Sequence, residues 1–270
     1  MKIVKSAATV LAAVASLVLI SACSDSDKTG TAGGGATTGA TGTAAPAPAK
    51  SLAPADQLAA AASKTGGGTY TFTMTSANAT ADGAADPTGP TSTGRLVVTL
   101  DKAKVTFETL FIGGTYLVKI SGLPVPGLDG RKWLRLDRSK LNDNSLLDAS
   151  SVKDPTGLSA FPGTVSQAST TDGRQFKGML DLTKQSFTIV DNDAVKGLGD
   201  LAKAVPFEAT VDEKGYLTSV KVSVPAYAQT KADQVRVTYS GFGTPLQAQP
   251  PAASEVIDAP EAAYRLLNGV

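Results

Sequence analysis

Residues 205–224 read VPFEATVDEKGYLTSVKVSV, and this stretch indicates what kind of fold the chain forms. On both sides of Glu213-Lys214-Gly215, large apolar residues alternate with polar ones. A period of two is typical of strands that bury one face, and a short polar turn with glycine joins two such strands into a hairpin. A third strand at 234–239 extends the hairpin to an antiparallel meander.

Strands with the same pattern are expected upstream, at 69–75, 95–101, 104–112, 115–120, 132–137 and 174–181. In 69–75, which reads TYTFTMT, every large apolar residue is followed by a threonine. The turns at 101–102 and 113–114 are short enough to make hairpins. Residues 77–93 are rich in Ala, Asp, Gly, Pro and Thr and predict a long loop. Residues 186–190 fit either a strand or a loop.

Helices are expected to be few and short. The first, at 52–65, has Pro54 in its first turn and Asp56 near the positive end of its dipole, and three glycines end it. Further short helices are expected at 141–149, at 155–160 as one helical turn, from Asp191 or Asp193 to 204, and at 261–267.

The strands share one apolar face, and an antiparallel sheet must cover such a face. Because the expected helices are few and rich in alanine, they can leave part of this face open for a ligand. The candidate lining consists of large apolar residues from four strands: Tyr70, Phe72, Met74, Leu96, Val98, Phe107, Phe111, Tyr116 and Val118. The same residues also fit an ordinary packed core.

The N-terminal residues predict export followed by attachment to a membrane. Lys2 and Lys5 precede an apolar run at 7–20, which is shorter than the ~20 residues of a membrane-spanning helix and describes a cleavable signal peptide. Ile20-Ser21-Ala22-Cys23 then resembles the lipobox of bacterial lipoproteins. The alternatives are an ordinary signal peptide with a chance cysteine, or a buried free thiol.

Cys23 is the single cysteine of the chain, so no internal disulfide can form. In a lipobox the thiol takes a diacylglyceryl group as a thioether, with chains such as palmitate, and becomes the first residue of the mature protein. Two acyl chains matter because one alone gives only marginal, reversible membrane binding. We therefore expect a lipid-anchored protein at the extracytoplasmic face of the cell membrane.

Residues 24–50 contain only Ser, Asp, Lys, Thr, Gly, Ala and Pro, none of which anchors a core. This composition predicts a disordered tether that spans about 30 Å as a flexible coil. The expected organisation is a lipoprotein signal peptide at 1–22, the acylated cysteine and tether at 23–50, a folded domain at 51–245, and a Pro-rich C-terminal tail at 246–270 that can end in a short helix.

Charge and composition exclude several classes of function. The chain has 25 Lys and Arg against 24 Asp and Glu, and loss of Lys2 and Lys5 with the signal leaves 23 against 24. This balance argues against a nucleic-acid partner. Histidine is absent, which removes Ser-His-Asp and Cys-His nucleophiles and imidazole-based zinc sites. Carboxylates, Ser-Lys pairs and oxygen-ligated metals remain.

Several local motifs have plainer explanations than a functional site. Lys64-Thr65-Gly66 and Ser150-Ser151-Val152-Lys153 match motifs of penicillin-binding enzymes, but their order is reversed and the third motif is missing between them. Asp191-Asn192-Asp193 could bind calcium, but it lacks the glycine and glutamate of an EF-hand and is better explained as a helix cap. Trp133, the sole tryptophan, fits core packing beside 122–130 better than ligand stacking.

Several short segments together resemble the LppX/LprG class of actinobacterial lipoproteins, which is related in architecture to the LolA and LolB carriers. The segments are 132–137 (KWLRLD), 171–173 (TDG), the hairpin 205–224, and 237–243 (VTYSGFG). The resemblance covers about residues 51–245. It implies an α+β fold in which a strongly curved antiparallel β-sheet, a half-barrel, packs over a few short helices and encloses an apolar cavity for acyl chains.

The function that this resemblance implies is the binding or carriage of an acylated lipid or glycolipid, without catalysis, cofactor or metal. An envelope transporter is a candidate partner that loads or unloads the lipid. The alternative is an envelope protein–protein interaction module of the same fold with a filled core. A carboxylate-based hydrolase is a third hypothesis, and it requires Asp and Glu side chains that converge in a cleft.

Overall fold

The structure is a computed structural model that describes residues 52–89, 91–100, 103–142, 154–184, 189–190 and 192–269. Lys50–Val270 form one compact unit. The expected signal peptide, Cys23 and the tether lie outside the described residues. Within the described ranges, none of the helices has the length and apolar character needed to cross a membrane.

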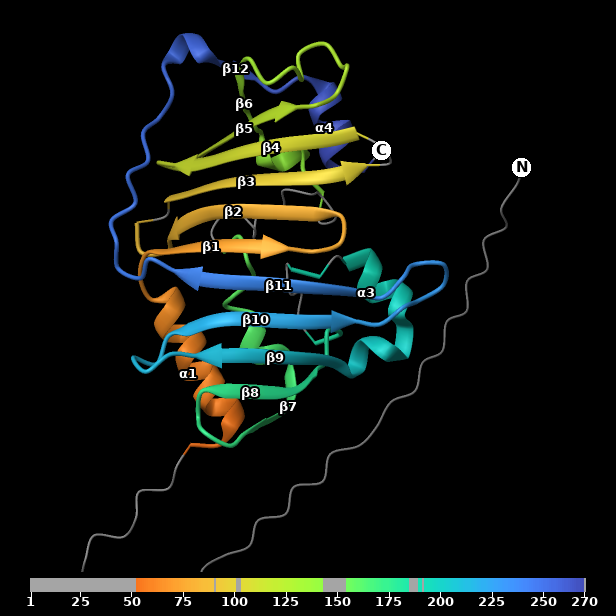
Figure 1. Cartoon of the computed structure of the whole chain (residues 1–270). Coiled ribbons are helices and arrows are strands. Elements are labelled where there is room, and N and C mark those ends of the chain that lie inside the picture. The colour runs from red at the N-terminus through yellow and green to blue at the C-terminus, as the bar shows by residue number, and fades with distance from the viewer. Residues whose placement is uncertain are drawn as a thin grey trace, which may run out of the picture. The chain divides into compact units, whose positions relative to one another are not determined.

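The described strands form one open, twelve-stranded sheet with β12 and β7 at its edges (Figure 1). All pairings are antiparallel except the parallel pairing of β12 with β6. The prediction of an α+β fold built on an antiparallel sheet with a few short helices is confirmed. From edge to edge, the strands are β12 (Val256–Asp258), β6 (Trp133–Arg135), β5 (Thr115–Ser121), β4 (Ala103–Ile112), β3 (Thr91–Leu100), β2 (Ala79–Asp86), β1 (Tyr70–Thr75), β11 (Asp233–Ser240), β10 (Leu217–Val224), β9 (Val205–Val211), β8 (Gln175–Leu180) and β7 (Val165–Thr170).

The sheet consists of two meanders of consecutive strands that meet at its centre. One runs from β1 to β6 and the other from β7 to β11, and β1 pairs with β11. In this pair Phe72 lies opposite Tyr239, and the hydroxyl groups of Thr73 and Thr238 are 2.6 Å apart. The ring of Tyr70 also contacts Tyr239 edge to face, with 5.8 Å between the ring centres. The central pairing therefore combines backbone hydrogen bonds with side-chain contacts on both faces.

The prediction of a loop at 77–93 is wrong, because β2 occupies Ala79–Asp86 and β3 begins at Thr91. The sequence of β2, ATADGAAD, contains mostly weak strand formers. At Gly83, a Cβ atom would collide with the Thr93 carbonyl oxygen and lie 2.8 Å from the Phe72 ring. Small residues are therefore required here because neighbouring strands supply the side chains that cover β2. Strands β7 and β12 were not predicted either.

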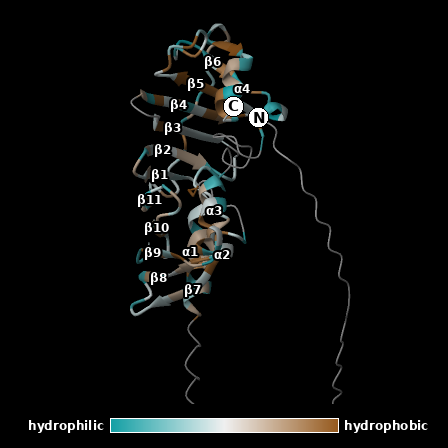
Figure 2. Cartoon of the chain, turned by 90° about the vertical axis from the view of Figure 1, so that its right-hand side faces the viewer, coloured by the Kyte–Doolittle hydropathy of each residue, from teal (hydrophilic) through white to brown (hydrophobic). Residues whose placement is uncertain are grey.

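Four α-helices are described, α1 (Pro54–Gly66), α2 (Phe161–Thr164), α3 (Asn192–Leu198) and α4 (Glu261–Leu267), with 3-10 helices η1 (Arg138–Lys140), η2 (Gly199–Lys203) and η3 (Ala253–Glu255). The edge-on view in Figure 2 shows all four α-helices on the same side of the sheet. Helix α1 packs against β7, β10 and α2. Its buried residues Leu58, Ala61, Ala62 and Thr65 have the spacing of one helical face.

The helices predicted at 52–65 and 261–267 are confirmed as α1 and α4, and the one predicted from Asp191 or Asp193 to 204 appears as α3 followed by η2. The segment predicted as one helical turn at 155–160 is a turn that leads into α2. From residue 143 onward, the helix predicted at 141–149 lies outside the described residues, as do 186–188.

Two hydrophobic clusters cover the helical side of the sheet. The first joins α1, α2 and α3 to β1 and to strands β8–β11. The second joins α4 to β4, β5 and β6. Strands β2 and β3 lie between them and contribute few buried side chains: Ala85 belongs to the first cluster, while Leu96 and Val98 pack partly buried against the second. Among the described residues, β2 and β3 therefore contribute fewer buried side chains to the helical side than β1 and β4 beside them.

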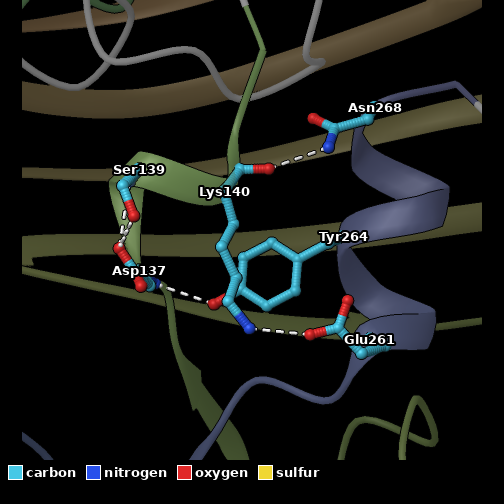
Figure 3. Close-up of polar contacts among 6 residues, drawn as sticks. All are labelled: Asp137, Ser139, Lys140, Glu261, Tyr264 and Asn268. Carbon is cyan, nitrogen blue, oxygen red and sulfur yellow. Dashed lines mark hydrogen bonds and ion pairs between the residues drawn. The ribbon is translucent and has the colours of Figure 1, made fainter.

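The C-terminal residues belong to the domain, so the boundary predicted at 245 is wrong. Strand β12 pairs with β6, and the side chains of Ala263, Tyr264 and Leu267 are buried in the second cluster. In Figure 3 the Tyr264 hydroxyl accepts a hydrogen bond from the Asp137 backbone N–H at 2.8 Å. The prolines that suggested a tail instead lie in the extended segments that lead into β12 and α4.

The packing of α4 predicts that alanine substitutions at two neighbouring leucines lower the free energy of unfolding by different amounts. Leu267 is fully buried, so Leu267→Ala should lower the free energy of unfolding by about 2–4 kcal/mol through lost contacts and a cavity. Leu266 is only partly buried, so Leu266→Ala should cost clearly less. Urea unfolding of both variants measures the difference. Equal losses would show that α4 does not pack as described.

Candidate functional site

All nine predicted lining residues lie on one face of the sheet, as expected. Across the sheet, Met74 lies opposite Ala81, Ala81 opposite Leu96, and Leu96 opposite Phe107. Directly paired residues share a face, and so do residues two apart on one strand. Phe111 pairs with Tyr116 on the same face. This face is the one covered by the two clusters.

Among the described residues, the nine are divided between two hydrophobic clusters. Those that are 5% exposed or less fill the clusters: Tyr70 and Phe72 in the first, and Phe107, Phe111, Tyr116 and Val118 in the second. Met74, Leu96 and Val98 remain partly exposed. Six of the predicted lining residues are therefore buried within the clusters, and three leave apolar surface accessible on β1 and β3.

A pocket of about 310 Å³ lies beside the first cluster. This volume is at the lower end of the roughly 300–1,000 Å³ that small-molecule sites occupy. Its floor is buried and mainly apolar, and consists of Ala62, Tyr70 and Leu158. Its rim is exposed, and consists of Ser63, Pro87 and Ser159. Gly66, Asp154 and Pro162 complete the lining at intermediate depth.

Local sequence explains how each wall forms. The C-terminal half of α1 presents Ala62, Ser63 and Gly66, whose small side chains leave space that a larger residue would fill. The opposite wall is a tight turn that begins at Asp154. The Asp154 carboxylate accepts hydrogen bonds from the backbone N–H of Leu158 at 2.8 Å and of Ser159 at 2.7 Å. This turn therefore fixes the positions of the Asp154 carboxylate and of Leu158 in the pocket lining.

Tyr70 at the pocket floor belongs to a buried polar cluster with Tyr239 and Thr156, which lie outside the pocket lining. The Tyr239 hydroxyl donates a hydrogen bond to Thr156 Oγ1 at 3.3 Å, and Thr156 is fully buried. Burial raises the pKa of Tyr239 well above the ordinary value for a phenol, and the hydrogen bond with Thr156 partly offsets this. Burial, followed by the charge of Asp154, likewise raises the pKa of Tyr70. Both phenols therefore stay protonated at neutral pH.

The carboxylates of the described pocket residues bear on the hydrolase hypothesis. Asp154 is the one carboxylate among the residues that line the pocket, whereas glycoside hydrolysis requires two. Among the described residues, no group of three His, Cys, Asp or Glu side chains could hold a metal ion. The arrangement can bury an apolar group and accept a hydrogen bond at its edge.

The other motifs from the sequence have structural roles where they are described. The Thr65 hydroxyl accepts a hydrogen bond from the Leu217 backbone N–H at 2.8 Å, which fixes the end of α1 to β10. Asp193 forms an ion pair with Lys196 at 3.0 Å in α3. Trp133 is partly buried and lies under the Lys119 ammonium, 5.0 Å from the ring centre. Ser150–Lys153, Asp191 and Cys23 lie outside the described residues.

Sequence reasoning found Tyr70 but missed the rest of the pocket. Asp154-Pro155-Thr156-Gly157 has the composition of a turn, and this was the available signal for the wall that holds Asp154. No sequence pattern pairs this turn with α1 or with Tyr239, because these contacts join segments far apart in the chain. Comparison with known proteins gives no matching family model and no matching curated protein.

The buried phenols predict a stability change at alkaline pH. Each folded-state pKa is raised, so the folded chain keeps protons that the unfolded chain releases near pH 10. The contribution of these two phenols to the free energy of unfolding should therefore be constant below about pH 10 and fall above it.

Tyr239→Phe should make this alkaline fall shallower and should cost about 1 kcal/mol at pH 7 for the lost hydrogen bond to Thr156. Urea unfolding of both proteins from pH 7 to about pH 11 measures the two effects separately. The same alkaline slope in wild type and variant would contradict the description of Tyr239 as a buried, protonated group.

Proposed function

We propose that this chain is a lipid-anchored protein of the extracytoplasmic membrane face that binds or carries an acylated lipid or glycolipid without catalysis. The observation that carries the proposal is the pocket beside α1, which has a buried, mainly apolar floor and an exposed rim. Such a gradient suits an amphiphile, because its chain gains free energy by leaving water while its polar end stays hydrated.

The size of the pocket limits what it can hold. A volume of about 310 Å³ equals roughly ten groups of the ~30 Å³ that a water molecule occupies in the liquid. The pocket therefore has room for the end of one acyl chain rather than for several chains. The partly exposed Met74, Leu96 and Val98 offer further apolar surface on the same side of the sheet. The strongly curved half-barrel implied by the LppX/LprG resemblance belongs to this proposal, as does an envelope transporter as partner.

The second candidate is an interaction module of the same fold with a filled core. It is favoured by the six predicted lining residues that are 5% exposed or less and pack inside the two clusters. Under this alternative the pocket stays empty, and the protein docks on another envelope component. Lipid content of the purified protein separates the two candidates.

The test uses residues 50–270, which form one compact unit and lack the acylation site. Native mass spectrometry should detect a co-purifying acylated species that organic extraction removes. Ala62→Phe adds a ring to the pocket floor and should reduce the retained lipid at least about fivefold. Ala60→Phe, on the exposed side of the same helix, is the matched control and should retain the lipid.

Circular dichroism and thermal unfolding should show that both variants fold. A wild-type protein that carries no lipid and takes up no added phospholipid or glycolipid would reject the carrier function and favour the interaction module. Equal lipid retention by the two variants would place the lipid elsewhere than in this pocket.

The anchoring part of the proposal has its own prediction. Cys23→Ala in the full-length chain removes the thiol that would carry the diacylglyceryl group, so the protein should lose incorporation of labelled palmitate and leave the membrane fraction. Ser21→Ala, which keeps a small residue in the motif, should still be acylated. Palmitate incorporation and membrane association that persist in the Cys23 variant would refute the lipobox interpretation.

A further inference from the structure

We propose that Asp154 makes the pocket select amphiphiles whose polar end is a hydroxyl or an ammonium group, and reject those that end in a carboxylate or phosphate. This inference rests on the proposed function, because it assigns the polar end of the ligand whose chain enters the pocket. It follows from the depth of each lining residue, from the hydrogen bonds of Asp154 and from the charges around the pocket.

Depth fixes the orientation of the ligand. Tyr70 and Leu158 are buried at the floor, whereas Ser63 and Ser159 are exposed at the rim. A chain gains most from the buried end, so the polar end of a bound amphiphile lies at the rim. Asp154 is less buried than Tyr70 and less exposed than Ser159. Among the described lining residues, it is the charged group available to the polar end of a ligand.

The Asp154 carboxylate can accept one more hydrogen bond, from a ligand. Its carboxylate accepts from the backbone N–H groups of Leu158 and Ser159 and from the Ser159 hydroxyl at 2.7 Å. A carboxylate has about four acceptor positions, so one remains beyond these three. The turn also holds the carboxylate in place before a ligand arrives, which lowers the entropic cost of binding.

Charge decides which polar end is accepted. Among the described residues, the pocket lining contains Asp154 but no Lys or Arg, and no ion pair joins Asp154 to a basic residue. Lys64, the neighbour of Ser63, instead donates a hydrogen bond to the Lys214 carbonyl and lies over the Tyr216 ring. An anionic end would therefore meet a like charge without a compensating cation, whereas an ammonium or hydroxyl group can donate to the carboxylate.

The charge of Asp154 is also felt inside the pocket. It contributes to the raised pKa of Tyr70 at the floor and of Tyr239 behind it. The Asp154 charge is therefore close enough to both phenols to be felt on the pocket side of the turn.

The experiment compares three amphiphiles with the same chain and different polar ends, decylamine, decanol and decanoate, each below its critical micelle concentration. Isothermal titration calorimetry of residues 50–270 at pH 7 should give the order decylamine, decanol, decanoate, with about tenfold between the first and the last. The spread should narrow when the ionic strength rises from about 0.01 M to about 1 M, because salt screens a half-exposed charge.

Three variants, one of them a control, test whether the preference arises at Asp154. Ser63→Lys places a cation at the rim without changing any residue of the Asp154 turn, and it should reverse the order so that decanoate binds best. Ala60→Lys adds the same charge on the exposed side of α1 and should leave the order unchanged. Asp154→Asn should remove the preference for decylamine, provided that circular dichroism shows an intact fold.

The outcomes separate this inference from the proposed function. Equal affinity for the three amphiphiles, or tightest binding of decanoate by the wild type, would overturn the role of Asp154 while leaving the pocket as a chain-binding site. If Ser63→Lys leaves the order of the three affinities unchanged, the proposed role of Asp154 is overturned as well. If none of the three binds but an acylated lipid co-purifies, only this inference fails. If neither is found, both fail.

Discussion

The pairing of β1 with β11 is the interaction on which the rest of the structure depends. Each meander forms from strands adjacent in the chain, but β1 and β11 lie more than 150 residues apart, so their pairing carries the cost of closing a long loop. Backbone hydrogen bonds, hydroxyl contacts such as Thr73 with Thr238, and the edge-to-face contact of Tyr70 with Tyr239 offset that cost. Without this pair, neither meander would share a sheet with the other.

The C-terminal segment makes a second long-range connection. After β11, at the centre of the sheet, the chain continues to the outer edge of the first meander, where β12 pairs with β6 and α4 covers the second cluster (Figure 1). The Arg135–Asp258 ion pair at 2.7 Å and the Asp137–Tyr264 hydrogen bond fix it there. The exposed ion pair contributes little by itself, so burial of Tyr264 and Leu267 supplies most of the stabilisation.

The pocket is a consequence of how the first cluster closes. Helix α1 has small residues where it faces the Asp154 turn, and the turn holds Leu158 against the cluster through hydrogen bonds to a carboxylate. An apolar floor and a single anionic group thus arise from the same local structure. In our proposal these two features have separate tasks, since the floor binds a chain and the carboxylate discriminates between polar ends.

Sequence alone determined which segments are strands with one apolar side, because side-chain alternation is local and survives any arrangement of the chain. It therefore placed Tyr70, Phe72, Met74 and the other six lining residues on a common face, and it identified α1 and α4. It failed at β2, where small residues form a strand only because Phe72 and the neighbouring strands cover them. Tertiary structure alone decided how the apolar face is divided between two buried clusters, and that Asp154 lies in the same pocket as Tyr70. Both outcomes depend on contacts between segments distant in sequence, and no local pattern records which distant segments meet.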